Sequence, residues 1–235
     1  MNAGIEMLNE WGLSVAERHV VAQCSGNFNY IHDIGRDELP KILQVVGEDD
    51  AVADQIATQS YIHNNGFDKI VLDQTEGRHV VIRLHVWQHE RGRASFESNI
   101  HSHRWPFCSI LLSGHLHYSH YSPSPGGELL YRYKYLRTEG EAGVYGLEAA
   151  GRERLASVIT ATRGPDEVYA IDSSVIHHVA PPDRFTATLV IQGRAERDYT
   201  DVFSWRHNLA VPRVRAPRVT RAIIRDRVLR VLRAL

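Results

Sequence analysis

The sequence predicts a mainly β fold, a barrel of short strands with helices before it and a basic helix after it. Three observations predict this class. Short runs rich in β-branched and aromatic residues follow one another from Phe67 onward, separated by Gly, Pro, Asp and Ser. The stretch before them has apolar residues at helical spacing, and residues 213–235 are rich in arginine. We therefore expect a single domain over 1–235, with a helical region (1–66), a barrel (67–200) and a basic tail (213–235).

Composition narrows the class of protein. The 235 residues are 43% hydrophobic and 23% charged, which is typical of a soluble globular chain. A net charge of -1 argues against a whole-protein field that attracts nucleic acid. Two cysteines give no disulfide framework, and the opening "MNAGIEMLNEWGL" lacks the pattern of a signal peptide. No apolar run approaches the roughly 18 residues of a membrane span. These features predict a cytoplasmic protein with reduced thiols.

Two helices are predicted between residues 36 and 64. The first, "RDELPKILQVV", and the second, "EDDAVADQIATQSYI", each place apolar residues on one face, and the acidic start of the second suits a helix N-terminus. The inward residues are Leu39, Ile42, Leu43, Val46, Val52, Ile56 and Ile62.

Strands are expected over most of the following chain. The run "FDKIVLDQTEGRHVVIRLHVW" has the pattern of a hairpin with its turn at "DQTEG". Further strands are predicted at "SILLSGHLHYSHY", "LLYRYKYLR", "ASVITATRG", "EVYAIDSSVIHHVAP" and "TATLVIQGRA".

The C-terminal segment has a different character. It carries eight arginines against the single acid Asp226, and its apolar residues can share one helical face. We expect this face to pack on the barrel or on a second copy of the chain, with an anionic membrane or RNA as the alternative partner. The face consists of Ile223, Ile224, Val228, Val231, Leu232 and Leu235.

Histidine is abundant, with 14 residues, so a metal site is tested first. His101 and His103 are separated by one residue, which on a strand places both imidazoles on the same face, about 6.6 Å apart at their attachment points. The second such pair, His115 and His117, is predicted on an outer face or rim. A third ligand on a late strand would complete a facial set. The stretch "IDSSVIHHVAPPD" offers His177 or its neighbour, and adjacent strand residues point to opposite faces, so only one of the two can join.

These motifs resemble those of the cupin superfamily. His101, His103 and Gly114 fit its first motif, an H-x-H followed by a glutamate and a glycine, and "DSSVIH" resembles its second motif, which ends in histidine. Phe107 or Cys108 stands at the glutamate position. The resemblance implies a jelly-roll barrel with a three-histidine metal site.

Within that superfamily the chain is similar to the cysteine dioxygenase (thiol dioxygenase) branch over residues 67–193. Trp87 matches a tryptophan of that branch, Cys108 lies near where many members carry a cysteine, and "YAIDSSVIHHVAPP" assigns the third ligand to His177. The similarity implies a nonheme iron dioxygenase or oxidase that uses O2 on a small polar, amino-acid-like or thiol-bearing substrate. Zinc, nickel or manganese are alternative metals, and with them the site would serve an isomerase, lyase or decarboxylase. A non-catalytic binding module is the third interpretation.

Three departures affect the predicted substrate. Lys69 stands where cysteine-specific members have an arginine that binds the substrate carboxylate, and a lysine lacks the planar fork of that arginine. The tyrosine that crosslinks to the cysteine in some members has no clear counterpart, because "TLVIQGR" offers Gln192 to Arg194 instead. The loop "QHERGRASFES" is longer than in the family.

Five residues are candidates for substrate binding. Lys69 and Arg83 could hold an anion, although Arg83 shares its strand face with His85 and could equally face outward. Trp105 has two interpretations, a core residue or an aromatic wall of the pocket, and Cys108 is interpreted as either pocket wall or buried small hydrophobe. Trp87 completes the set. We assign no general base, since a metal can itself deprotonate a bound thiol.

Overall fold

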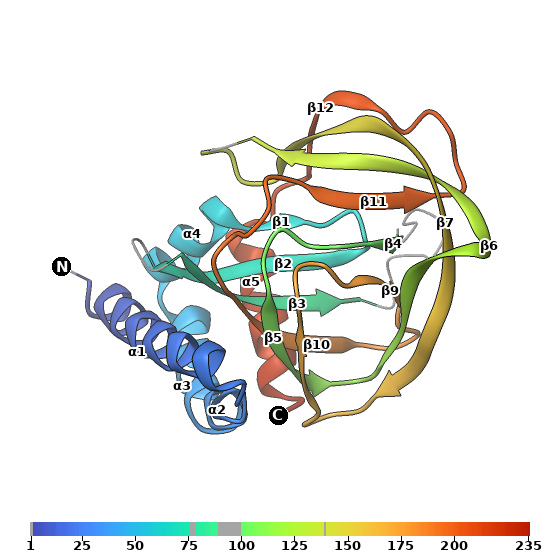
Figure 1. Ribbon diagram of the computed structural model, residues 1–235. Coiled ribbons are helices and arrows are strands. Elements are labelled where there is room, and N and C mark those ends of the chain that lie inside the picture. Colours follow the sequence, from blue (N-terminus) through green and yellow to red (C-terminus); the bar gives the residue numbers. More distant parts are fainter. Residues whose placement is uncertain (1, 76–78, 89–99, 139) are drawn as a thin grey trace.

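The protein is built from two antiparallel sheets that face each other, with helices against the outer side of one of them (Figure 1). The structure, a computed structural model, describes residues 2–75, 79–88, 100–138 and 140–235. The long loop predicted before the histidine pair lies outside the described residues from position 89 to position 99.

The first sheet has the strand order β1-β2-β3-β10-β5-β8 and the second β11-β4-β9-β6-β7-β12. From β3 to β11 the chain passes alternately between the two sheets, except at the hairpin of β6 and β7. This alternation is the connectivity of a jelly roll, so the predicted fold class is confirmed. The strands of the first sheet are Tyr61–Ile62, Phe67–Thr75, Val80–Trp87, Thr186–Gln192, Phe107–Ser113 and Val168–Ile171 in that order; those of the second are Thr200–Ser204, Ile100–His101, Ile176–Ala180, Leu116–Arg137, Val144–Arg163 and Val211–Arg215.

The helices that precede the barrel are α1 (Ala3–Ser25), α2 (Tyr30–Asp33), a π-helical turn (Ile34–Glu38), α3 (Leu39–Glu48) and α4 (Asp50–Gln59). Both helices predicted between residues 36 and 64 are present, and Asp49 caps α4 by accepting from two backbone N–H groups. The second ends earlier than expected, because Ile62 belongs to β1. Helix α1 was not predicted; Asn2 caps its start.

Strands β6 and β7 form one long hairpin where shorter strands were predicted. The predicted run through "SILLSGHLHYSHY" is split at Gly114, whose φ of 81° turns the chain between β5 and β6. Conversely, the "SPSPGG" segment does not end a strand but forms a bulge inside β6, where Pro123 and Glu128 both pair with Leu155. A Cβ at Gly127 would lie 2.4 Å from the Leu155 backbone, so only glycine allows this close approach.

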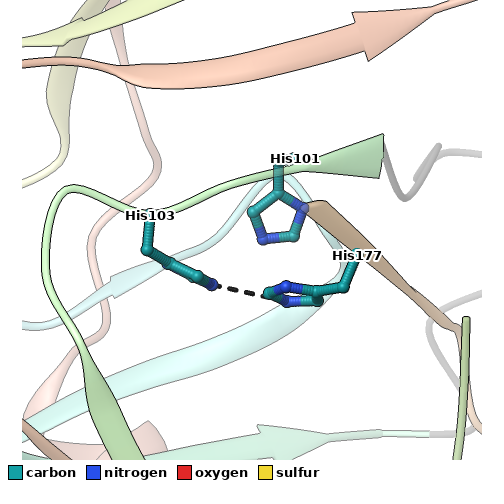
Figure 2. Close-up of side chains that lie close together, drawn as sticks. All are labelled: His101, His103 and His177. Carbon is teal, nitrogen blue, oxygen red and sulfur yellow. Dashed lines mark hydrogen bonds between the residues drawn. The ribbon is translucent and has the colours of Figure 1, made fainter. Parts of the chain in front are cut away.

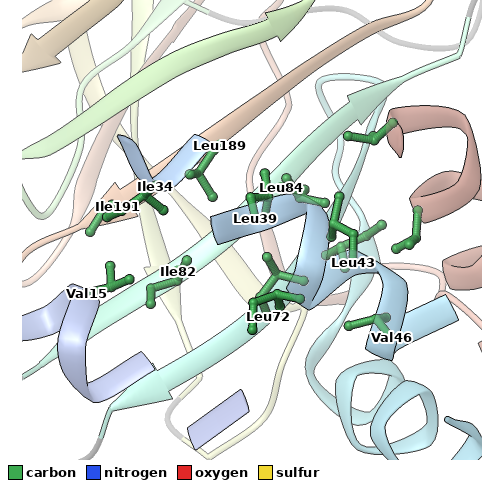
Figure 3. Packing of buried hydrophobic residues seen from close by; sticks show 14 of the residues in the cluster. Val15, Ile34, Leu39, Leu43, Val46, Leu72, Ile82, Leu84, Leu189 and Ile191 are labelled. Atoms are coloured by element: carbon green, nitrogen blue, oxygen red, sulfur yellow. The ribbon is translucent and has the colours of Figure 1, made fainter. Parts of the chain in front are cut away.

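The main hydrophobic core lies between the helices and the first sheet (Figure 3). Val15, Ile34 and Leu39 from the helical region pack there against Ile82 and Leu84 of β3. Alternating strand residues face this core, as expected for a sheet with one face covered by helices.

The basic tail forms β12 and then α5 (Arg221–Leu232), which packs on α3 and α4. Ile224, Val228 and Val231 are buried within the chain, which agrees with the predicted apolar face but places it on helices rather than on the barrel. Arg227 donates to the buried carboxylate of Asp68 at 2.7 Å. No described helix is long and apolar enough to cross a membrane.

Candidate metal centre

Three histidine side chains converge at the inner side of the second sheet (Figure 2). His101 ends β4, His103 follows two residues later, and His177 of β9 is the direct partner of His101 in the antiparallel ladder. The ring centres are 4.6 to 5.0 Å apart. The residue between the first two points the other way: the buried Ser102 hydroxyl accepts from the Asp201 backbone N–H at 3.1 Å. This anchor orients both flanking imidazoles toward His177.

The geometry and charge of this cluster fit a metal ion. One ring nitrogen from each histidine lies within 4.8 Å of the other two, and the Nε2 atoms of His103 and His177 are 3.4 Å apart. Two ligands each about 2.1 Å from a shared ion are separated by about 3.0 to 3.4 Å. Burial, followed by the proximity of the other rings, lowers the pKa of His103 and of His177 well below the usual value. Both imidazoles are therefore neutral, the form that binds a metal.

The structure distinguishes the two candidates for the third position. His177 is 4% exposed and faces the cluster, whereas His178 is the adjacent strand residue and pairs with Ser119 of β6. His115 and His117 lie on the outer side, where His115 approaches Asp183 and His117 bonds Thr162.

The cluster lies in the wall of a cavity of about 180 Å³ between the two sheets. Its described lining contains cationic, imidazole and tyrosine side chains but no aspartate or glutamate. A cavity with this charge favours ligands that carry negative charge or hydrogen-bond acceptors. The predicted residues that line it are His101, His103, His177, Lys69, Arg83, Trp87 and Trp105.

Arg83 faces the cavity, which selects between its two predicted orientations. The side chain is buried at 3% exposure, donates to the Gln192 side-chain oxygen at 2.6 Å, and lies 5.5 Å from the centre of the Trp105 ring. Burial lowers the pKa of Arg83 to about 10, so the guanidinium stays charged at neutral pH. Its Nε and the Trp105 Nε1 are buried donors without a partner among the described residues. These donors suit an acceptor-rich ligand.

Lys69 also lines the cavity, but with a different partner. Its amine donates to the Tyr61 hydroxyl at 3.0 Å. Burial, and then Arg83 and Arg137, lower the pKa of Lys69 well below its usual value. The uncharged amine is therefore available near neutral pH, unlike the cation predicted from the sequence.

A stack of rings forms another part of the wall. Phe67 lies between His63 and His85, at centroid distances of 4.5 and 4.3 Å, and Trp87 contacts Phe67 at 4.9 Å. Only Trp87 was among the predicted binding residues. The two-residue spacing that puts His85 on the strand face of Arg83 was the available signal for it; nothing local marked His63.

Cys108 is corrected: it lies outside the cavity lining, on the opposite face of the first sheet. The thiol is fully buried, 3.4 Å from the Tyr30 hydroxyl and 3.7 Å from Nδ1 of His19. Burial raises its pKa to about 12, so it is a protonated core residue rather than part of the pocket wall. Its neighbour Phe107 has the opposite strand parity and lines the cavity instead.

Comparison with known proteins gives distant structural similarities. No protein-family model matches the sequence, and no curated protein matches it significantly. Among solved structures, a cupin superfamily protein from Desulfitobacterium hafniense is 12% identical, with a TM-score of 0.30 over 56% of this chain and 81% of that one.

Two solved enzymes are similar at the same level. Hydroquinone 1,2-dioxygenase PnpCD, in complex with Cd2+ and 4-hydroxybenzonitrile, is 12% identical with a TM-score of 0.33 over 56% of this chain and 66% of that one. A single-substitution variant of the oxalate decarboxylase of Bacillus subtilis is 9% identical with a TM-score of 0.33 over 59% of this chain and 28% of that one. The fold assignment rests on the strand order described above rather than on these scores.

Proposed function

We propose that this chain is a metal-dependent oxygenase that holds ferrous iron on His101, His103 and His177 and acts on a small polar substrate with an anionic group. The observation that carries the proposal is the cluster of three imidazoles in the wall of a cavity whose described lining has no carboxylate. Because all three ligands would be neutral, a bound divalent ion would keep its full charge.

Ferrous iron, when bound, supplies O2 chemistry at the coordination positions that three protein ligands leave open. The protein's own contribution is to bind and orient the substrate beside them. The charged guanidinium of Arg83, held by Gln192 and lying over Trp105, is the group we assign to the substrate anion. The rings of Phe67 and Trp87 provide an apolar wall that excludes water from the same space.

The cavity volume limits the substrate to a small molecule. An amino-acid-like or thiol-bearing acid remains the proposed class, on the resemblance of the motifs. The cysteine that lies near the metal motif in the sequence takes no part, because Cys108 faces the helices.

The test begins with the metal content of freshly purified protein, followed by O2 uptake with a panel of small thiols and organic acids, using iron-loaded and zinc-loaded samples. We expect near-stoichiometric metal and O2 consumption with iron alone. Substrate loss without O2 consumption in the zinc-loaded sample would replace the oxygenase by a redox-inactive metalloenzyme. Failure to bind either metal would overturn both.

A further inference from the structure

We propose that the Lys69 amine, paired with the Tyr61 hydroxyl, is the proton acceptor of the cavity and deprotonates the substrate as it binds. This inference rests on the proposed function in one respect, that the cavity beside the three histidines is where the substrate lies. It gives Lys69 a catalytic role in place of the charged anchor expected from the sequence.

The pair is built by neighbouring strands. Tyr61 of β1 and Lys69 of β2 are direct partners in the antiparallel ladder, so their side chains leave the same face of the sheet, and both line the cavity. The amine is 3.0 Å from the hydroxyl oxygen and 5.0 Å from the centre of the Tyr61 ring. An amine that donates one N–H to this oxygen keeps its lone pair for a second partner.

The surroundings oppose a positive charge on this amine. The described cavity lining has no carboxylate to stabilise an ammonium ion, and two arginines, Arg83 and Arg137, lower the pKa of Lys69 in addition to burial. Burial raises the pKa of Tyr61, which keeps its hydroxyl protonated. The titratable and charged groups facing the pair are Arg83 and His85 from β3, Arg137 and Tyr135 from β6, Tyr145 from β7, and His63 from the turn before β2.

The proton transfer balances without a further reactant. An acidic X–H bond of the substrate breaks, its electron pair stays on the substrate, and an N–H bond forms on Lys69. The resulting ammonium donates to the Tyr61 oxygen and lies against the face of its ring. The substrate anion is then attracted by Arg83 and Arg137, the same charges that disfavour the ammonium.

The chain allows a direct test because it has three lysines, Lys41, Lys69 and Lys134. We would label the full-length, zinc-loaded protein with 13C,15N-lysine and follow the three side-chain signals by NMR from pH 6 to 11. Lys69→Met identifies its signal, with the melting temperature as a check of folding. We expect Lys69 to titrate at least two pH units below the exposed Lys41. Titration of the two together would overturn the proposal.

Cyanate is a second probe, because it reports whether the lone pair can be reached from the cavity. The uncharged amine adds to isocyanic acid: a C–N bond forms and the amine proton moves to the reagent nitrogen, giving a urea. At pH 7, peptide mass spectrometry should show Lys69 modified at least 10-fold faster than Lys41. An unmodified Lys69 would show that its lone pair is not available and would also overturn the proposal.

The His101→Ala protein separates this inference from the proposed function. Metal binding should be lost in that variant while the low titration of Lys69 remains. If the wild type binds no metal but Lys69 titrates low, the oxygenase proposal falls and the proton acceptor stands. If metal binds but Lys69 titrates like Lys41, the reverse holds.

Discussion

The two faces of strand β3 are made from the same eight residues yet have opposite physical characters. Val80, Ile82, Leu84 and Val86 pack in the main core beneath the helices, and each is at most 1% exposed. Arg83, His85 and Trp87, which alternate with them, line the cavity.

The difference extends to how polar groups are satisfied. On the cavity side, Arg83 Nε, His85 Nε2, Trp105 Nε1 and His177 Nδ1 are buried without a partner among the described residues. Leaving a buried donor unpaired typically costs about 1–3 kcal/mol, so this face gives up stability that the helix-covered face supplies. One face is built for packing and the other for binding.

The largest expected effect tests the cavity face at its metal cluster. His177→Ala should weaken metal binding by at least roughly 100-fold, because it removes one of three ligands where loss of an outer partner alone costs 10–100-fold. His178→Ala is the matched control, since that side chain lies on the other face of β9. Metal titrations of the two variants check this, and equal affinities would show that the cluster is not the site.

The second prediction compares neighbouring residues of β3 directly. Leu84→Ala should lower the free energy of unfolding by about 3 kcal/mol, because it opens a space in a fully buried core. Arg83→Met should change it by less than about 1 kcal/mol, since an apolar side chain of similar length avoids burying a charge. Urea unfolding of both variants measures the difference. A larger loss at Arg83 would mean that the cavity face carries stability after all.

The third prediction sharpens the comparison at the helix-covered face, where His19 is a rare polar residue. Burial lowers the pKa of His19 to about 4, below its usual 6.5, so protons bind the unfolded chain more tightly. Its contribution to stability is present above pH 6.5 and is lost as the pH falls toward 4. Between pH 7 and pH 5 the wild type should therefore lose about 2 kcal/mol more than His19→Phe does. Equal losses in urea unfolding at the two pH values would contradict a neutral, buried His19.

Much of this contrast could be predicted from local pattern. Strict alternation in "VVIRLHVW" predicted a strand with two faces, and the one-residue spacing of His101 and His103 predicted a converging pair. The convergence is present, although β4 ends at His101 and the orientation of His103 depends on Ser102 and β11.

The remainder depended on contacts that no local pattern encodes. The parity of Cys108 with Ile110 and Leu112 was evident, but whether that face met helices or the cavity was fixed by the distant α1 and α2. Tyr61 was invisible as a site residue because its role arises only when β1 pairs with β2.

The position of α5 has a consequence for how the chain acquires its structure during synthesis. Ile224, Val228 and Val231 complete a core that otherwise consists of segments made much earlier, and Arg227 covers the carboxylate of Asp68, next to Lys69. Until residues as far as Leu232 have left the ribosome, apolar surface on α3 and α4 stays open to water and to other nascent chains. A nascent chain of this protein therefore needs protection by chaperones until a late stage of translation.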